Sequence, residues 1–271
     1  MANTVAKAGG VQFAAGSLKP KIPGTLRCLV AEAVREFHMI GEGDKVLVGL
    51  SGGKDSLTML HVLLELRRRS PVKFEIGAAT VDPQTPEYDP SPLVPYMQQL
   101  GVEYHFLSKP IIEMAKTSMD PKRPSLCSFC SRMKRGLLYS CMREHGYTCL
   151  ALGQHLDDVV ESFVMSAWHN GALRTMKANY WVQQDDVRVI RPLVLVRESI
   201  CTSFARQAQL PIISDNCPAC FAAPKERHRI KMMLSEQEVE FPKLFPSLLK
   251  TLRPLLSIAH ANKENDFFRD S

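Results

Sequence analysis

Short apolar runs alternate along this chain with longer stretches in which apolar residues recur every three or four positions. Short apolar runs are typical of buried strands, and the longer recurrence is typical of amphipathic helices. We expect strands at residues 45–50, Phe74–Val81, Val102–Leu107, Tyr147–Leu152 and Val187–Pro192. We expect helices at Leu26–His38, Leu57–Leu66, Pro92–Leu100, Arg132–Glu144, Asp157–Trp168 and Glu198–Gln207. This alternation predicts an α/β fold: a mostly parallel sheet with helices on both faces.

The pattern changes near residue 216. Residues Lys225–Leu234 predict a basic helix, and Phe241–Ile258 is an apolar segment interrupted by three prolines. Because proline breaks a helix interior, we expect Pro242, Pro246 and Pro254 to divide that segment into short helices. The proline-rich stretches 83–92 and 117–126 predict loops. The expected parts are a flexible arm at 1–25, a main domain at 26–215, a helical region at 216–258 and a polar tail at 259–271.

The most informative stretch joins the first expected strand to the helix that follows it. Its sequence, residues 51–56, is Ser-Gly-Gly-Lys-Asp-Ser. Gly52 and Gly53 allow a sharp turn that brings backbone N–H groups close to an anion, and a helix N-terminus behind the turn favours a phosphate. This is not the G-x-x-x-x-G-K-[ST] phosphate loop, since Asp55 follows Lys54. An aspartate beside phosphates predicts a bridging Mg²⁺.

Composition and charge narrow the class of protein. The formal net charge is +6 and the isoelectric point is about 8.9, which is compatible with an RNA or nucleotide partner. No apolar run approaches the ~20 residues needed to cross a bilayer, and the arm lacks a secretory signal. We expect a cytoplasmic protein without a membrane partner. Organellar targeting is the alternative, because the arm has no acidic residue.

Eight cysteines in a chain without a secretion signal argue against a disulfide framework. Two pairs have the C-x-x-C form, Cys127/Cys130 and Cys217/Cys220. Four thiolates could hold a structural zinc, three could hold a [4Fe–4S] cluster with one open iron, and one pair could carry redox or persulfide sulfur. Spacing alone favours zinc. The isolated cysteines, which we expect in the core, are Cys28, Cys141, Cys149 and Cys201.

Several segments together resemble a known family. The Ser51–Ser56 stretch resembles the PP-loop of the ATP pyrophosphatase superfamily, whose members split ATP between the α- and β-phosphates. Further segments follow in the order of the tRNA 2-thiocytidine synthetase family: Cys127-Ser-Phe-Cys130-Ser-Arg-Met-Lys-Arg-Gly, Ala151-Leu-Gly-Gln-His-Leu-Asp-Asp158, Arg191-Pro-Leu and Cys217-Pro-Ala-Cys220. The resemblance covers roughly residues 26–255. One departure is Gly153-Gln154-His155, where the family commonly has Gly-His-His.

The resemblance implies an enzyme, a tRNA sulfurtransferase. It would adenylate cytidine 32 of the anticodon loop with ATP and replace the 2-oxygen by sulfur delivered through a [4Fe–4S] cluster. The implied cluster ligands are Cys127, Cys130 and Cys220, with Cys217 as the alternative third ligand. This resemblance moves the interpretation from zinc to iron–sulfur.

The expected site residues fall into three groups. ATP and Mg²⁺ are assigned to Ser51, Gly52, Gly53, Lys54, Asp55, Ser56, Thr80, Val81, Asp82, Gly153, Asp157 and Asp158, and among these Lys54, Asp55 and Asp158 are the expected catalytic residues. RNA phosphates are assigned to Arg132, Lys134, Arg135, Lys225, Arg227 and Arg229. A solvated basic helix face explains Arg132, Lys134 and Arg135 equally well. An aspartate at a helix start also acts as an N-cap, which is the alternative role of Asp157 and Asp158.

Two other functions compete with this one. A wobble-uridine tRNA 2-thiolation enzyme usually carries extra N-terminal zinc-binding cysteine pairs, whereas Cys28 stands alone here. A non-catalytic zinc-ribbon RNA-binding protein would not favour the acidic residues Asp55, Asp157 and Asp158. The expected partners are tRNA and a sulfur donor such as a cysteine desulfurase. A homodimer through the apolar C-terminal helices is also expected.

Overall fold

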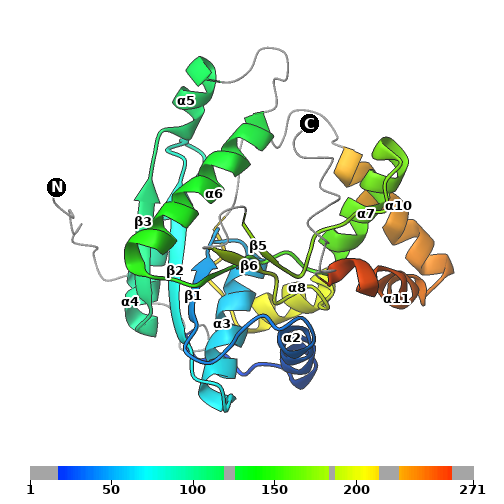
Figure 1. The fold of residues 1–271 in the computed structure, drawn as a ribbon, viewed down its shortest axis with the longest axis horizontal. Coiled ribbons are helices and arrows are strands. Elements are labelled where there is room, and N and C mark those ends of the chain that lie inside the picture. The colour runs from blue at the N-terminus through cyan, green and yellow to red at the C-terminus, as the bar shows by residue number, and fades with distance from the viewer. Residues whose placement is uncertain (1–17, 119–125, 183–186, 214–225, 258–271) are drawn as a thin grey trace.

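A six-stranded sheet with the order β3-β2-β1-β4-β6-β5 forms the centre of the protein (Figure 1). The structure, a computed structural model, describes residues 18–118, 126–182, 187–213 and 226–257. The strands are β1 Lys45–Gly49, β2 Glu75–Asp82, β3 Glu103–Ser108, β4 Cys149–Ala151, β5 Asn179–Trp181 and β6 Arg188–Ile190. Neighbouring strands are parallel except β5, which pairs antiparallel with β6. The predicted mostly parallel α/β fold is confirmed.

Helices cover both faces of the sheet (Figure 1). They are α2 Gly24–Glu36, α3 Lys54–Arg69, α4 Leu93–Leu100, α5 Ile111–Ser118, α6 Leu126–His145, α7 Leu156–Asn170, α8 Glu198–Gln207, α10 Glu226–Glu240 and α11 Leu244–Leu256. In β1, Val46 and Val48 face the larger core with α2 and α3, while Leu47 faces the core under α6. Alternate strand residues point to opposite faces, so burial on both faces explains the unbroken apolar run that predicted this strand.

The chain turns to opposite sides of the sheet at β1. From β1 it builds β2 and β3 on one side, and later it returns to build β4 and β6 on the other. In open α/β sheets, ligands bind at such a reversal, beyond the carboxyl ends of the strands. The loops after β1 and β4 both lie at this place, so the sheet topology brings residues 51–56 together with residues 152–158.

Several predicted boundaries were wrong. Helix α5 and strand β5 were not predicted, and α6 begins six residues before the predicted Arg132. Helix α11 runs through Pro246 and Pro254 instead of breaking there. Pro246 lies in the first turn, where backbone N–H groups have no intrahelical partner, and Pro254 lies in the last turn.

Other predictions fall on parts of the chain that the structure does not describe. These are most of the arm at 1–25, most of the loop at 117–126, the tail at 259–271, Cys217, Cys220 and Lys225. Among the isolated cysteines, Cys141, Cys149 and Cys201 are buried as predicted. Cys28 is exposed on α2, so its core assignment was wrong. None of the helices in the described residues has both the length and the apolar character needed to cross a membrane.

Candidate functional site

The loop that follows β1 is held in shape by its own hydroxyl groups. The Ser51 N–H donates to Ser56 Oγ at 3.2 Å, and Ser56 Oγ donates to the Gly53 carbonyl at 3.0 Å. Gly52 has φ +81°, a left-handed conformation that favours glycine, and a Cβ there would lie 3.0 Å from Ile213. The Ile213 N–H also donates to the Gly52 carbonyl at 2.9 Å. The glycine loop predicted from the sequence is therefore held by hydrogen bonds within the loop and by a further hydrogen bond from Ile213.

The loop that follows β4 packs directly on the first loop. A Cβ on Gly153 would lie 3.2 Å from the backbone nitrogen of Ser56, so a side chain there would push the two loops apart. His155 caps α7, because its Nδ1 accepts from the Asp158 N–H at 3.3 Å and its own N–H donates to Asp158 Oδ2 at 3.1 Å. This reciprocal capping fixes Asp158 at the cavity while it also stabilises the helix start. The capping and functional interpretations of Asp158 are therefore compatible.

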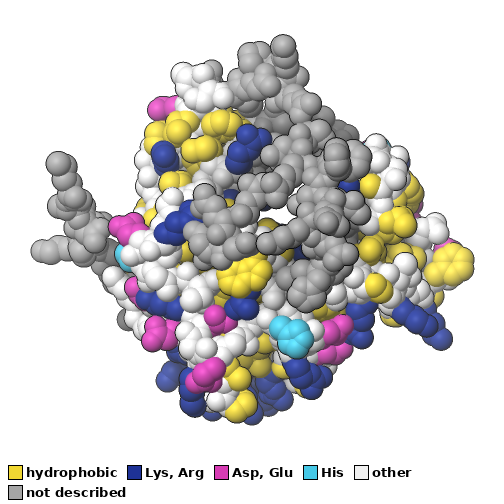
Figure 2. Space-filling view, in the orientation of Figure 1, with side chains coloured by type: hydrophobic (Ala, Val, Ile, Leu, Met, Phe, Trp, Pro, Cys, Tyr) yellow, Lys and Arg dark blue, Asp and Glu magenta, His cyan; other side chains and the backbone are white. Residues whose placement is uncertain are grey.

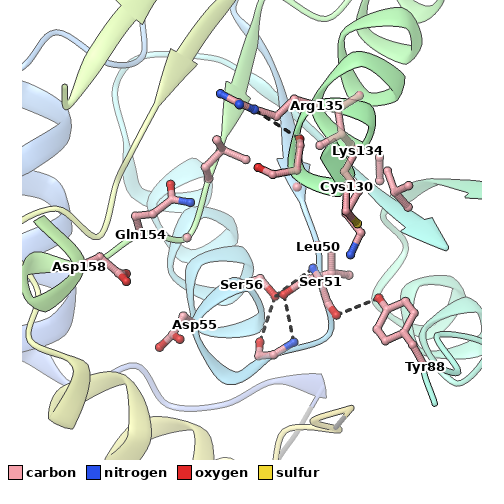
Figure 3. Close-up of a pocket in the computed structure, with 18 of the residues that line it drawn as sticks. Leu50, Ser51, Asp55, Ser56, Tyr88, Cys130, Lys134, Arg135, Gln154 and Asp158 are labelled. Carbon is pink, nitrogen blue, oxygen red and sulfur yellow. Dashed lines mark hydrogen bonds between the residues drawn. The ribbon is translucent and has the colours of Figure 1, made fainter. Parts of the chain in front are cut away.

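The two loops and α6 enclose a cavity of about 500 Å³ (Figure 3). Its described lining includes Ser51, Gly53, Asp55, Ser56, Val81, Tyr88, Cys130, Lys134, Arg135, Gly153, Gln154, Asp158 and Arg227. Figure 3 shows Asp55 and Asp158 on one side of the cavity, and Cys130 and Lys134 entering from α6 on the other. The cavity thus has an acidic wall and a wall that carries a thiol and positive charge.

Asp55 is the least satisfied polar group of the acidic wall. Its Oδ1 atom is buried and has no hydrogen-bond partner among the described residues. Its Oδ2 atom lies 3.1 Å from Lys54 Nζ and 4.0 Å from His155 Nε2. A buried carboxylate oxygen without a donor is costly unless a cation binds it. Together with Asp158, Asp55 offers the hard oxygen ligands that Mg²⁺ prefers.

Lys54 is held by a second acid that the sequence analysis did not identify. Its Nζ lies 2.9 Å from Glu198 Oε1, and Lys231 binds Glu198 Oε2 at 2.5 Å. Burial alone would raise the pKa of Glu198, but hydrogen bonds from Lys231 and Lys54 lower it to about 2. Burial alone would also lower the pKa of Lys54, yet its bonds to Glu198 and Asp55 raise it. Both groups therefore stay charged at neutral pH, and Glu198 fixes the position of the Lys54 ammonium.

Arg227 lines the cavity, whereas the sequence predicts that it binds RNA phosphates. Its guanidinium is 3.7 Å from Asp158 Oδ1 and 3.8 Å from Glu161 Oε2. Burial raises the pKa of Glu161 to about 7, and the neighbouring Asp158 carboxylate contributes to the rise. Arg229, two residues later, pairs instead with Glu226 and lies over the Trp168 ring. The two arginines therefore face different surroundings.

Some predicted site residues do not face the cavity. Thr80 is buried and donates to the Leu50 carbonyl at 2.7 Å, and Asp82 accepts from Ser108 and from the Gln84 N–H. Val81 is the member of that strand end that lines the cavity. Both oxygens of Asp157 are occupied, by Arg197 Nε at 3.1 Å and by the Glu198 N–H at 2.7 Å. The placement of Asp157 favours a structural role over the predicted metal role, because each oxygen of its carboxylate already accepts a hydrogen bond and the residue does not line the cavity.

The α6 wall combines Cys130 with the basic residues that follow it. Cys127 lies one turn earlier in the same helix, and its side chain is outside the described residues. Lys134 and Arg135 line the cavity, whereas Arg132 is exposed. Figure 2 shows dark blue Lys and Arg side chains over α6 on this face of the molecule. Lys134 and Arg135 therefore place two positive charges on the α6 wall of the cavity.

Two further cavity contacts were not predicted from the sequence. The Tyr88 hydroxyl donates to the Ser51 carbonyl at 2.9 Å. Gln154, the departure from Gly-His-His, accepts from Arg191 Nε at 3.0 Å. The Arg191-Pro-Leu segment was a usable signal for the second contact, whereas Tyr88 lies in a proline-rich loop that gave none.

Comparison with known proteins adds three findings. A family model described as a PP-loop domain matches residues 29–237. The chain is 39% identical over 223 residues to the tRNA-cytidine(32) 2-sulfurtransferase of Geobacter sulfurreducens, covering 82% of this chain and 86% of that protein. It is 40% identical over 236 residues to the protein of the same name from Pseudomonas syringae pv. syringae, covering 86% and 84%.

A solved structure also matches. The U34-tRNA thiolase NcsA from Methanococcus maripaludis, solved with its [4Fe-4S] cluster, superposes with a TM-score of 0.66 at 24% identity. The match covers 85% of this chain and 80% of that one. At this level of identity the likeness establishes a shared fold.

Proposed function

We propose, from the premise that this chain belongs to the PP-loop domain family and to the tRNA-cytidine(32) 2-sulfurtransferases within it, that it transfers sulfur to cytidine 32 of tRNA at the expense of ATP. The observation that carries the proposal is one cavity that brings together the Ser51–Ser56 loop, two carboxylates and the Cys130 thiol. A binding module for RNA would gain nothing from buried acidic groups, which repel phosphate.

The residues present fit ATP with Mg²⁺. The glycine loop leads into the start of α3, where no side-chain cap bonds the helix N–H groups and a phosphate is favoured. Asp55, with its unsatisfied buried oxygen, and Asp158 would hold the metal, whose chemistry is to neutralise charge on the departing pyrophosphate. Lys54, positioned by Glu198, adds a fixed positive charge on the same side.

The chemistry then needs two displacements. In the first, the 2-oxygen of cytosine bonds to the α-phosphorus of ATP, and the bond to the β-phosphate breaks to release pyrophosphate. In the second, sulfide bonds to C2 of the base, the C2–O bond breaks, and AMP departs with that oxygen. Arg227, which lines the cavity, would balance the charge on the nucleotide phosphates.

The cysteines are compatible with an iron–sulfur cluster at the α6 wall. Cys130 lines the cavity, and Cys127 precedes it by one helical turn. The second C-x-x-C segment lies in the sequence between Ile213 and Glu226. Ile213 is hydrogen-bonded to Gly52, and Glu226 precedes the cavity-lining Arg227. At ~3.5 Å per residue, this connection is long enough to bring Cys217 or Cys220 to the same cavity. A [4Fe–4S] cluster held by Cys127, Cys130 and Cys220 would supply an open iron for sulfide, and Cys217 remains the alternative ligand.

The remaining assignments concern partners and location. Lys134 and Arg135 at the cavity, with the exposed Arg132, are proposed to guide tRNA phosphates. The sulfur donor is proposed to be a cysteine desulfurase, and the location is proposed to be the cytoplasm.

The homodimer remains a prediction, but its expected surface changes. Helix α11 packs Phe245, Leu252 and Leu256 into the core of its own chain. Exposed Val239, in the last turn of α10, and exposed Phe241, which follows that helix, are the candidate contact residues.

The test uses protein purified without oxygen and incubated with unmodified tRNA, ATP, Mg²⁺ and sulfide. Iron is measured first, and digested tRNA is then analysed by mass spectrometry. The proposal predicts about four irons per chain and 2-thiocytidine. Thiouridine instead would support the wobble-uridine alternative. Stoichiometric zinc without iron, together with no nucleotide cleavage, would support the zinc-ribbon alternative.

A further inference from the structure

A second group of metal-binding side chains lies at the end of α6 remote from the cavity. His105 of β3 meets Cys141 and His145 of α6, with one ligand atom from each residue within 4.8 Å of the others. The two imidazole rings are 4.2 Å apart between centroids. Cys141 lies eleven residues beyond Cys130, which is about 16 Å along a helix. This group is therefore separate from the proposed cluster cysteines.

The local structure brings these side chains together. Cys141 and His145 are four residues apart, so they share one face of α6. Near the end of α6, Cys141 belongs to the same buried cluster as Tyr147 and as Ala79 of β2, the strand that pairs with the edge strand β3. A spacing of four residues on a helix, with a third ligand from a neighbouring strand, is a common way to bind a transition metal.

The contacts of His105 orient its ring. Its Nε2 lies 2.9 Å from the Tyr147 hydroxyl and 3.6 Å from Glu103 Oε1. Metal-binding histidines normally hold one ring nitrogen in such a hydrogen bond while the other binds the ion. The Tyr147 side chain occupies the space beside Gly77 that a side chain would otherwise fill. A Cβ on Gly77 would lie only 2.0 Å from the Tyr147 hydroxyl oxygen, so glycine at this position keeps the Tyr147 site open.

The charge around the group favours a cation. Burial lowers the pKa of His105, and His145 lowers it further, so the neutral imidazole that binds metals is favoured. Burial raises the pKa of Cys141 to about 11, with added contributions from the carboxylates of Glu144 and Glu103. Lys45 offsets part of this negative charge, since its Nζ lies 3.3 Å from Glu103. A bound divalent ion would displace the thiol proton and be neutralised by the thiolate and the adjacent carboxylates.

We propose that His105, Cys141 and His145 bind one zinc ion, which fastens the C-terminal end of α6 to the edge strand β3. Two imidazoles and one thiolate match the ligands that zinc prefers, with a fourth position left for water. Because α6 also carries Cys130, the ion would hold in place the helix that forms one wall of the cavity.

The test measures zinc and iron in the full chain, purified without oxygen and washed with a mild chelator. His145→Ala, at an exposed position, and Cys141→Ala should each contain one zinc per chain less than the parent, with iron unchanged. The matched controls are His169→Ala and Cys28→Ala, both exposed and outside the group. X-ray absorption at the zinc edge should show one sulfur and at least two nitrogen ligands in the parent.

Several results would overturn this inference. One is a zinc content that is the same in the parent, the two ligand variants and the two control variants. Another is a parent that contains no zinc and binds none when micromolar Zn²⁺ is titrated against a chromophoric chelator. The inference does not depend on the proposed function. Failure of that function would appear in the iron content and the thionucleoside, whereas failure here would appear in the zinc that depends on His145.

Discussion

At the scale of single residues, neighbours in the sequence take different roles that only the fold separates. Asp157 and Asp158 are adjacent, yet Asp158 lines the cavity while Asp157 accepts hydrogen bonds from Arg197 and the Glu198 N–H. Successive residues of a helix point about 100° apart, because 3.6 residues complete a turn. The sequence therefore predicted an acidic pair at the right place, but it could not decide which member faces the ligand.

Arg227 and Arg229 offer the sharpest pair of variants. They lie two residues apart on α10 and point in nearly opposite directions. Arg227 points toward Asp158 and Glu161, whereas Arg229 points toward Glu226. Arg227→Gln should lower kcat/KM for ATP by about 10- to 100-fold, as expected for the loss of a charged hydrogen bond. Arg229→Gln should keep kcat/KM for ATP within about twofold of the parent value. A change in tRNA affinity without any change toward ATP would return Arg227 to the RNA role predicted from the sequence.

Glu198 predicts a pH dependence of stability. Its pKa of about 2 lies below the ordinary value of 4.5, because Lys54 and Lys231 bind the carboxylate despite its burial. A lowered pKa contributes stability above the unfolded value, and that stability is lost as the pH falls from about 4.5 toward 2. Glu198→Gln should therefore reduce the free energy of unfolding at pH 7 by on the order of 2 kcal/mol.

Urea unfolding at several pH values tests this, with Glu240→Gln at an exposed position of α10 as the control. The difference between parent and Glu198→Gln should shrink below pH 4.5. A difference that stays constant down to pH 2.5 would contradict the assignment.

The two C-x-x-C pairs carry a prediction that still rests on the sequence. If Cys220 is the third iron ligand, Cys220→Ser should lose the visible absorbance of the cluster and Cys217→Ser should keep it. Anaerobic reconstitution followed by spectroscopy and iron analysis decides between them. The reverse pattern would exchange the two assignments and leave the fold unaffected.

At the scale of elements, the site depends on how closely two loops pack. Gly153→Ala would place a methyl group 3.2 Å from the Ser56 nitrogen. We expect ATP affinity to fall at least tenfold and the protein to lose about 1–3 kcal/mol of stability, as for other overpacked positions. Gly136→Ala is the control, since no atom lies within 4 Å of a Cβ on that residue of α6. It should stabilise the protein by about 0.5–1 kcal/mol.

Calorimetry for nucleotide binding and thermal unfolding separate the two effects. Unchanged ATP affinity in Gly153→Ala would mean that the loops tolerate displacement and that their contact does not shape the site.

Element positions were predictable where periodicity is strong. The buried runs of β1 and β2 and the apolar spacing of α2 were located within a few residues. The three-residue strand β5 is too short to show a period, and α11 continues through Pro246 because a helix start needs no N–H there. These errors moved boundaries but not the site.

At the scale of the whole molecule, the reversal of strand order at β1 explains why residues about a hundred positions apart form one cavity. The loop at 51–56, the loop at 152–158 and α6 meet there, and each had been singled out by its own residues. Contacts that depend on tertiary packing could not be predicted. Glu198 contacts Lys54, and Ile213 contacts Gly52. The partners in each pair are too far apart in the sequence for a local pattern to predict the contact.

The central claim is that adenylation and sulfur delivery are separate steps served by separate walls of the cavity. The most direct measurement is 2-thiocytidine in digested tRNA, quantified together with pyrophosphate after reaction with the parent, Asp55→Asn and Cys130→Ser. Asp55→Asn should keep its iron and lose both products by at least ~10³-fold, since loss of a metal ligand costs several kcal/mol. Cys130→Ser should lose iron and thiolation while it still binds ATP. Normal thiolation by Asp55→Asn would contradict adenylation at this site, and normal thiolation by iron-free Cys130→Ser would remove the cluster from the reaction.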